Sequence, residues 1–172
     1  MVIGVIVALL AVYTNPVERV RQGFFPPGAP VPVTQLAEGG PAHPAPGTQV
    51  VAATSLEALS QTMLGDRLCL EQECWRDVHV PPATLLVATI PTRCGSREWY
   101  GWTNGSMLTI DLVTWGCVGL RPGDEARAAA TYALLGIPLN RLPRGRLLVS
   151  VVDSGAPPVQ VTVSWPALAP GG

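Results

Sequence analysis

The segment from Cys94 to Cys117 constrains the fold of this chain more than any other. It contains two of the four cysteines, three of the five tryptophans and the clearest turn signal of the sequence, Asn104-Gly105-Ser106. Asn-Gly and Gly-Ser both suit the central positions of a tight hairpin turn, where a residue must adopt positive φ. The segment therefore predicts two antiparallel strands joined at residues 104–106.

The two turn candidates predict different strand registers. With Gly105-Ser106 in the turn, Cys94 lies directly opposite Cys117, with about 4.5–5.5 Å between the Cβ atoms, which is close to disulfide range. With Asn104-Gly105 in the turn, the two cysteines are displaced by one residue pair, which a bulge would have to correct. We expect a Cys94–Cys117 disulfide, and the alternative is two buried free thiols.

The other two cysteines, Cys69 and Cys74, enclose four residues. Four cysteines allow three pairings, and the spacing favours Cys69–Cys74 together with Cys94–Cys117. Disulfides place a domain outside the cytoplasm. A metal site built from Cys69, Cys74, His79 and Cys94 is the alternative, but this spacing does not match the usual zinc patterns. We expect no metal and no cofactor.

Three aromatic residues on the first hairpin strand form a candidate interaction surface. Trp99, Tyr100 and Trp102 project on both faces of a strand, because successive side chains alternate. Most of them are expected in the core, whereas an exposed Tyr/Trp pair is typical of a protein-binding surface. A sugar-binding platform is less favoured, because the neighbouring sequence supplies no polar cluster.

The amino-acid composition restricts the class of protein to which this chain can belong. A length of 172 residues suggests one domain with appendages, and only 13% of the residues are charged, with a net charge of −1. Nucleic acid is therefore not expected as a partner, since there is no basic patch to neutralise phosphates. Glycine and proline, 18 of each, cluster between apolar runs and favour a β-rich or loop-rich domain.

Residues 1–17 are apolar and uncharged, which predicts a membrane anchor or a signal-like segment. A signal peptide would have a basic start, and a buried core element is the third reading. About seventeen apolar residues is the lower limit for a membrane span. Arg19 and Arg21 would place the following chain in the cytoplasm, but the cysteines favour the extracytoplasmic side, which we expect.

Residues 18–48 predict a juxtamembrane segment and a proline-rich linker. Seven prolines lie between residues 26 and 48, a density that does not pack as a core and favours semi-rigid polyproline structure. The alternative is that this segment drapes over a partner subunit and orders there. The linker would hold a head domain, residues 49–166, away from the membrane, with residues 167–172 as a tail.

The head is expected to be all-β, mostly a β-sandwich with about six or seven strands and one short helix. Thr54-Ser55-Leu56-Glu57 matches a capping box with Thr54 as the N-cap, and the helix would end at Gly65. Residues 126–135 have helical propensity, but the proline-rich turn that follows favours a strand from Thr131. Further strands are predicted at 83–90, 145–153 and 159–165, beside the two of the hairpin, and residues 49–53 are a short apolar run.

No catalytic constellation is evident in the sequence. His43 lies in the linker, so His79 is the only candidate base in the head, with Asp77 two residues away and no glycine-flanked serine as nucleophile. The carboxylate pairs Glu71/Glu73 and Asp124/Glu125 are typical of solvated loops. We therefore expect a protein that is not an enzyme.

Two functions fit these features. The first is a non-catalytic, membrane-anchored accessory subunit, which is held to the membrane by residues 1–17 and whose extracytoplasmic head docks on the protein subunits of a larger membrane complex. The second is a free-standing cell-surface module that binds a peptide, a glycan or a small ligand through the Trp99–Trp102 hairpin.

Overall fold

The computed structural model describes residues 28–39, 49–62, 77–90, 96–115, 132–153 and 157–164, and the structural statements below concern these residues. Both predicted disulfides, the apolar segment 1–17 and the tail 167–172 lie outside the described residues. In the described ranges, no helix is long and apolar enough to cross a membrane.

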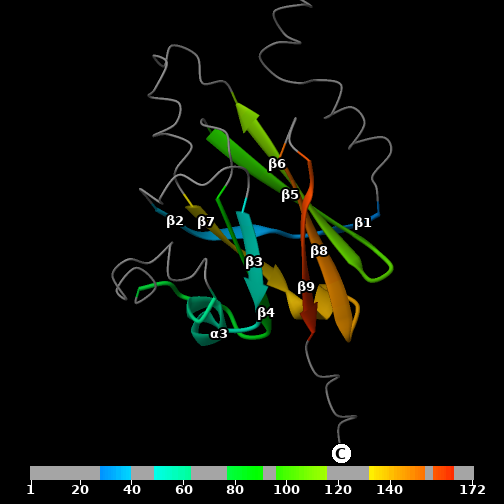
Figure 1. Cartoon of the computed structure of the whole chain (residues 1–172), viewed down its shortest axis with the longest axis horizontal. Coiled ribbons are helices and arrows are strands. Elements are labelled where there is room, and N and C mark those ends of the chain that lie inside the picture. The colour runs from blue at the N-terminus through cyan, green and yellow to red at the C-terminus, as the bar shows by residue number, and fades with distance from the viewer. Residues whose placement is uncertain are drawn as a thin grey trace, which may run out of the picture.

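The described residues form two β-sheets and one short α-helix, which confirms the prediction of an all-β domain (Figure 1). The five-stranded sheet has the order β1 (Ala29–Val31), β5 (Ser96–Asn104), β6 (Met107–Trp115), β8 (Arg146–Asp153) and β9 (Val159–Ser164). The four-stranded sheet has the order β2 (Thr34–Gly39), β7 (Tyr132–Pro138), β4 (Thr84–Ile90) and β3 (Gln49–Ala53). All hydrogen-bonded strand pairs are antiparallel except β6 with β8. These two strands can be parallel because the chain between them passes through the other sheet as β7.

The main hydrophobic core lies between the two sheets. It takes its side chains from alternate positions of each strand, as the two-residue period of a strand requires. The five-stranded sheet contributes residues such as Leu108, Ile110 and Val149, and the four-stranded sheet contributes Leu85 and Leu135. In Figure 1, β2 runs across the view, whereas β3, β8 and β9 run down it, and β3 lies beside β9 where the two sheets meet.

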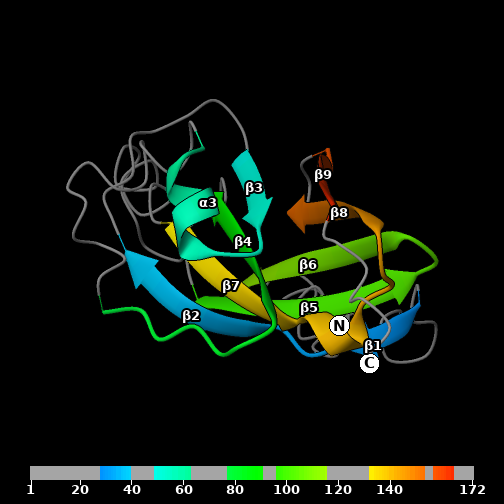
Figure 2. The ribbon, with the colours of Figure 1, turned by 90° about the horizontal axis from the view of Figure 1, so that it is seen from below.

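A second core cluster lies on the outer side of the four-stranded sheet, under α3 (Leu56–Ser60). Leu59 of the helix packs there with Leu86 and Ala88 of β4 and Leu134 of β7. Figure 2 shows α3 beside β3 and β4. Because both faces of the four-stranded sheet are covered here, β4 and β7 are buried at almost every position, which explains their unbroken apolar sequences.

The hairpin prediction is confirmed for β5 and β6, and the structure selects its register. Asn104 pairs with Met107, so Gly105-Ser106 form the turn. Gly105 has a φ of +56°, a conformation that glycine adopts without a steric penalty. The alternative turn at Asn104-Gly105 is wrong.

Part of the predicted linker is wrong, because residues 29–31 and 34–39 form β1 and β2. Val31 is only 6% exposed and belongs to the core, and Pro32-Val33 carry the chain from one sheet to the other. Pro30 is tolerated because β1 is an edge strand with three residues, where a missing N–H costs little. The described part of the chain therefore has nine strands, against the six or seven that the sequence predicts.

The structure also tests the predicted strand after Thr131 and the predicted helix cap. Residues 132–138 form a strand, as expected from Thr131 onward, so the helical alternative is wrong for residues 132–135. The helix cap is displaced by one residue: the hydroxyl of Ser55, not that of Thr54, accepts a hydrogen bond of 3.1 Å from the backbone N–H of Ala58. Ser55 has the extended backbone that an N-cap requires, so the helix begins one residue later than predicted.

Candidate functional site

The structure separates the three aromatic residues that the sequence grouped together. Trp99 packs against the core between the sheets, and its pairing partner Leu112 is buried. Tyr100 and Trp102 lie at the alternate positions of β5 and therefore point to the outer face of the five-stranded sheet. One compact ligand cannot contact all three rings at once.

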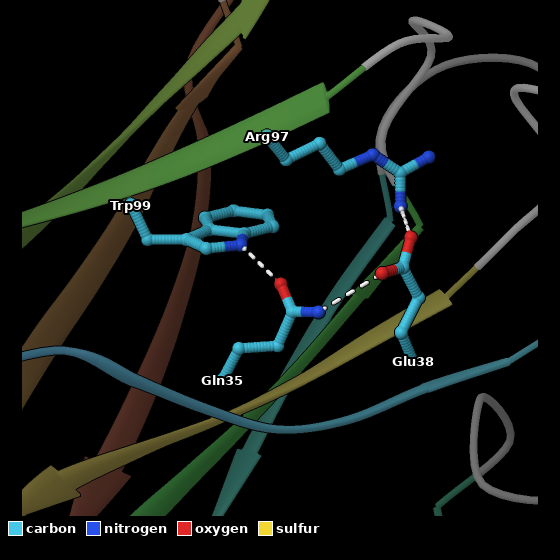
Figure 3. Close-up of polar contacts among 4 residues, drawn as sticks. All are labelled: Gln35, Glu38, Arg97 and Trp99. Carbon is cyan, nitrogen blue, oxygen red and sulfur yellow. Dashed lines mark hydrogen bonds and ion pairs between the residues drawn. The ribbon is translucent and has the colours of Figure 1, made fainter.

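Trp99 belongs to a polar network that joins the two sheets (Figure 3). Its indole N–H donates a hydrogen bond of 2.9 Å to Oε1 of Gln35 on β2, and Nε2 of Gln35 donates to Oε2 of Glu38 at 3.0 Å. Nη1 of Arg97 on β5 then donates to Oε1 of Glu38 at 3.3 Å. We call these four residues the inter-sheet network.

A β-bulge in β2 makes the inter-sheet network possible. The pairing of β2 with β7 shifts between Gln35 and Ala37, so that Gln35 pairs with Leu135 and Glu38 pairs with Ala133. In a regular strand, residues three positions apart point to opposite faces. The extra residue at the bulge instead brings Gln35 and Glu38 to the same inward face.

Arg97 is almost completely buried within this network. Its side chain is 4% exposed, against 48% for that of Glu38. Burial lowers the pKa of the Arg97 guanidinium, whereas the charges of Glu38 and of Asp153, a residue that is 1% exposed, oppose that change. The guanidinium thus interacts with one carboxylate at the rim and feels the charge of a second in the interior, which suits a structural contact between the sheets.

The outer face of the five-stranded sheet is defined by three rows of paired residues. The first row contains Pro30, Trp102, Thr109, Ser150 and Gln160. The second contains Tyr100, Asp111 and Val152, and the third contains Asn104, Met107, Leu148 and Thr162. We call the residues of these rows, together with Glu98, the outer face; the described helix α3 packs on the other sheet.

The two outer aromatic rings, those of Tyr100 and Trp102, lie close to several polar groups. The hydroxyl of Tyr100 donates a hydrogen bond of 2.6 Å to Oε2 of Glu98, and Asp111 lies directly across from Tyr100 in the strand pairing. The indole nitrogen of Trp102 is buried and has no hydrogen-bond partner among the described residues. The outer face therefore combines half-buried aromatic rings, two carboxylates and one unused donor.

Of the other sequence candidates, Asp77 and His79 lie in the described ranges, and they are apart from these groups. Asp77 and His79 are exposed, on a segment whose Val78 and Val80 pack against the outer cluster of the four-stranded sheet. Within the described ranges, no group of three or more histidine, cysteine or acidic residues is placed to hold a metal ion.

Sequence reasoning missed Gln35, Glu38 and Arg97 as neighbours of Trp99. Trp99 and Gln35 are 64 positions apart, and Gln35 lies in the segment that the sequence predicts as a linker. Residues 34–39, TQLAEG, show no alternation of polar and apolar residues, because the bulge interrupts the two-residue period of the strand. A comparison of the chain with protein-family models, curated proteins and solved structures finds no match.

Proposed function

We propose that this chain is a non-catalytic accessory subunit whose two-sheet head docks on the protein subunits of a larger membrane complex. The observation that carries this proposal is the outer face, where Tyr100 and Trp102 share one side of a sheet with Met107, Leu148 and Val152. Tyrosine and tryptophan dominate the energetics of protein interfaces, because they bury a large area at a small cost in conformational entropy.

The apolar segment 1–17 supports attachment to the membrane, and the four cysteines support an extracytoplasmic location for the head. Because β1 begins at Ala29, the spacer between this proposed anchor and the first strand is residues 18–28. A spacer of this length would keep the head close to the membrane surface, where it meets membrane-embedded subunits.

The second candidate function is a free-standing binding module on the cell surface, now restricted to Tyr100 and Trp102. The Tyr100–Glu98 hydrogen bond favours it, because it fixes the orientation of a ring and of a carboxylate before any ligand arrives. Both candidates use the same face, and they differ in whether the chain is recovered with a stable protein partner.

The test is a purification of the full chain from its native membranes in mild detergent. We expect the wild-type chain in a stoichiometric complex, and we expect Trp102→Ala and Tyr100→Ala to lose that complex. Gln160→Ala is the matched control, because Gln160 is an exposed residue at the far end of the Trp102 row and its removal should leave the complex intact.

A thermal-unfolding measurement on each variant shows whether the fold survives. If Trp102→Ala unfolds, Thr109→Arg replaces it, since this change adds bulk and charge beside Trp102 without removing a buried ring. Recovery of the wild-type chain without any partner would refute the accessory-subunit proposal. Recovery of the complex with every Tyr100, Trp102 and Thr109 variant would refute docking through the outer face.

A further inference from the structure

Three exposed arginines lie close together in the segment that joins β7 to β8. Arg141 is the last residue of the short 3₁₀ helix η1 (Leu139–Arg141), and Arg144 and Arg146 follow it. All three side chains are exposed, and none of them forms an ion pair with another residue in the described ranges. We call residues 139–146 the basic loop. Its charge is local and is not visible in the net charge of −1.

The domain holds the backbone of the basic loop in place. Leu142 is 7% exposed and belongs to the core between the sheets. The backbone N–H of Leu139 donates a hydrogen bond of 2.8 Å to the carbonyl oxygen of Ala83, and that of Leu142 donates to the carbonyl oxygen of Leu139 at 3.1 Å. The arginines therefore project from an ordered backbone, which lowers the entropic cost of binding through them.

The described chain begins at the same end of the molecule. A Cβ atom added at Gly28 would lie 3.4 Å from the Cβ atom of Asn104, so the start of the described chain lies beside the hairpin turn. In that turn, the carbonyl oxygen of Ser106 accepts a hydrogen bond of 2.8 Å from the backbone N–H of Leu148, close to the beginning of β8. Figure 2 shows β1, the turn between β5 and β6 and the beginning of β8 at one end of the molecule.

This end is also the one tethered to the proposed anchor. Residues 18–28, which join it to residues 1–17, span at most about 40 Å when fully extended. The spacer contains Arg19 and Arg21 against one acidic residue, Glu18. The basic loop therefore lies at the end of the domain that stays close to the membrane.

The charge at this end is positive. The three segments that meet there, residues 28–31, 103–107 and 138–148, contain no aspartate or glutamate. Glu98 and Asp153 lie toward the opposite ends of β5 and β8. The exposed carboxylates of Glu57 and Asp77 belong to α3 and to the segment that packs with it over the four-stranded sheet.

We infer that the basic loop binds the anionic headgroups of the lipid surface beside the proposed anchor. This inference goes beyond the docking of a protein partner, and it rests on the membrane attachment that the proposed function includes. Each basic side chain at an anionic lipid surface strengthens binding by about fivefold, so the three together contribute on the order of a hundredfold. The hairpin end of the head then faces the lipid, and the outer face stands up from the membrane toward neighbouring subunits.

The test uses the full chain reconstituted in lipid vesicles, with a fluorescent amino acid in place of the exposed Asn140, beside Arg141. A lipid with a nitroxide on its headgroup quenches the fluorescence when the basic loop lies on the surface. We expect strong quenching in vesicles of equal parts phosphatidylcholine and phosphatidylglycerol, and weak quenching in phosphatidylcholine alone. High salt should remove the difference, because it screens the attraction.

Two triple variants isolate the charge of the basic loop. Replacing Arg141, Arg144 and Arg146 by glutamine should abolish the stronger quenching that phosphatidylglycerol causes. Replacing the same three residues by lysine is the matched control, and it should preserve the quenching because the charge is kept. Thermal unfolding of both variants checks the fold, and the lipid and salt dependence of the wild-type chain tests the inference without any substitution at the arginines.

Equal quenching in the two kinds of vesicle, or in the glutamine variant and the wild-type chain, would overturn this inference. Absence of quenching in both, together with loss of the native complex in the glutamine variant, would also overturn it and assign the basic loop to an acidic protein subunit.

The fate of the proposed function is read separately. A native complex that is recovered intact, with a label that is never quenched, would leave the accessory-subunit proposal standing and remove the lipid contact. Quenching that depends on phosphatidylglycerol, in a chain that is recovered from native membranes without a partner, would refute the accessory role and support the lipid contact. Flotation of the chain with vesicles of phosphatidylcholine alone tests the anchor by itself.

Discussion

Arg97 and Glu38 form an ion pair whose two members differ in exposure to solvent. The guanidinium of Arg97 is buried, and the carboxylate of Glu38 is half-exposed. Glu38 can be solvated when its partner is removed, because its side chain is 48% exposed. Asp153 is 1% exposed and keeps its position in the interior when Arg97 is removed. Substitution of Arg97 should therefore lower the stability of the protein more than substitution of Glu38.

We expect Arg97→Met to lower the free energy of unfolding by about 3–5 kcal/mol, as when one member of a buried charge pair is removed. Glu38→Gln should cost about 1 kcal/mol or less, since a half-exposed ion pair is screened by solvent. Urea denaturation of the two variants and the wild-type chain measures both values. Equal losses would show that Asp153 does not depend on Arg97.

Tyr132 provides a prediction about alkaline pH. Burial raises the pKa of the Tyr132 phenol above its usual value of 10.0. The unfolded chain then loses this proton at a lower pH than the folded chain, so the folded state binds more protons above about pH 10 and stability falls as pH rises through that range.

Tyr132→Phe removes this contribution. The difference in unfolding free energy between the wild-type chain and Tyr132→Phe should be constant up to about pH 9 and should then shift in favour of the variant. Denaturant titrations of both proteins at several pH values measure the difference. A difference that stays constant through about pH 11 would contradict the raised pKa.

At the scale of the elements, the chain segment that leads from β1 to β2 lies very close to Gly101 of β5. A Cβ atom added at Gly101 would lie 2.6 Å from Cγ2 of Val33 and 2.7 Å from the carbonyl oxygen of Val31. The second contact is with backbone, which cannot move without disturbing the pairing of β1 with β5. Glycine is therefore required at this position by space.

Gly101→Ala should accordingly destabilise the domain by about 1–3 kcal/mol, the usual cost of forcing extra volume into a packed site. Gly105→Asn is the matched control: nothing lies near the Cβ position there, and asparagine tolerates the positive φ of the turn. Thermal unfolding compares the two variants. An equal or smaller loss for Gly101→Ala would mean that β1 is not held against β5 as described.

The sequence was sufficient for elements whose signal is local. The turn residues beside Asn104 indicated the hairpin, and the alternation in residues 159–164 indicated β9. The sequence did not indicate β1 and β2, because prolines usually exclude strands. Proline is accepted in an edge strand, but which strand lies at an edge depends on the assembled sheet and is not visible in the sequence. The inter-sheet network was missed for a related reason, since a bulge in β2 decides which way Glu38 points.

At the scale of the whole molecule, β1 and β2 belong to the domain. They complete one edge of each sheet, and Val31 fills part of the core. A chain that begins at Gly28 should therefore unfold cooperatively and retain its β-sheet circular dichroism. A chain that begins at Gln49, the boundary predicted from the sequence, should lose the cooperative transition; cooperative unfolding of that shorter chain would restore the linker interpretation.

The central claim is that the outer face contacts a protein partner, and site-specific photocrosslinking in native membranes tests it most directly. A photoreactive amino acid at Thr109 lies beside Trp102 on the outer face, whereas one at the exposed Ala58 lies on α3 over the other sheet. The account predicts one discrete crosslinked protein from position 109 and none from position 58. A crosslink from position 58 alone, or none from either position, would contradict it.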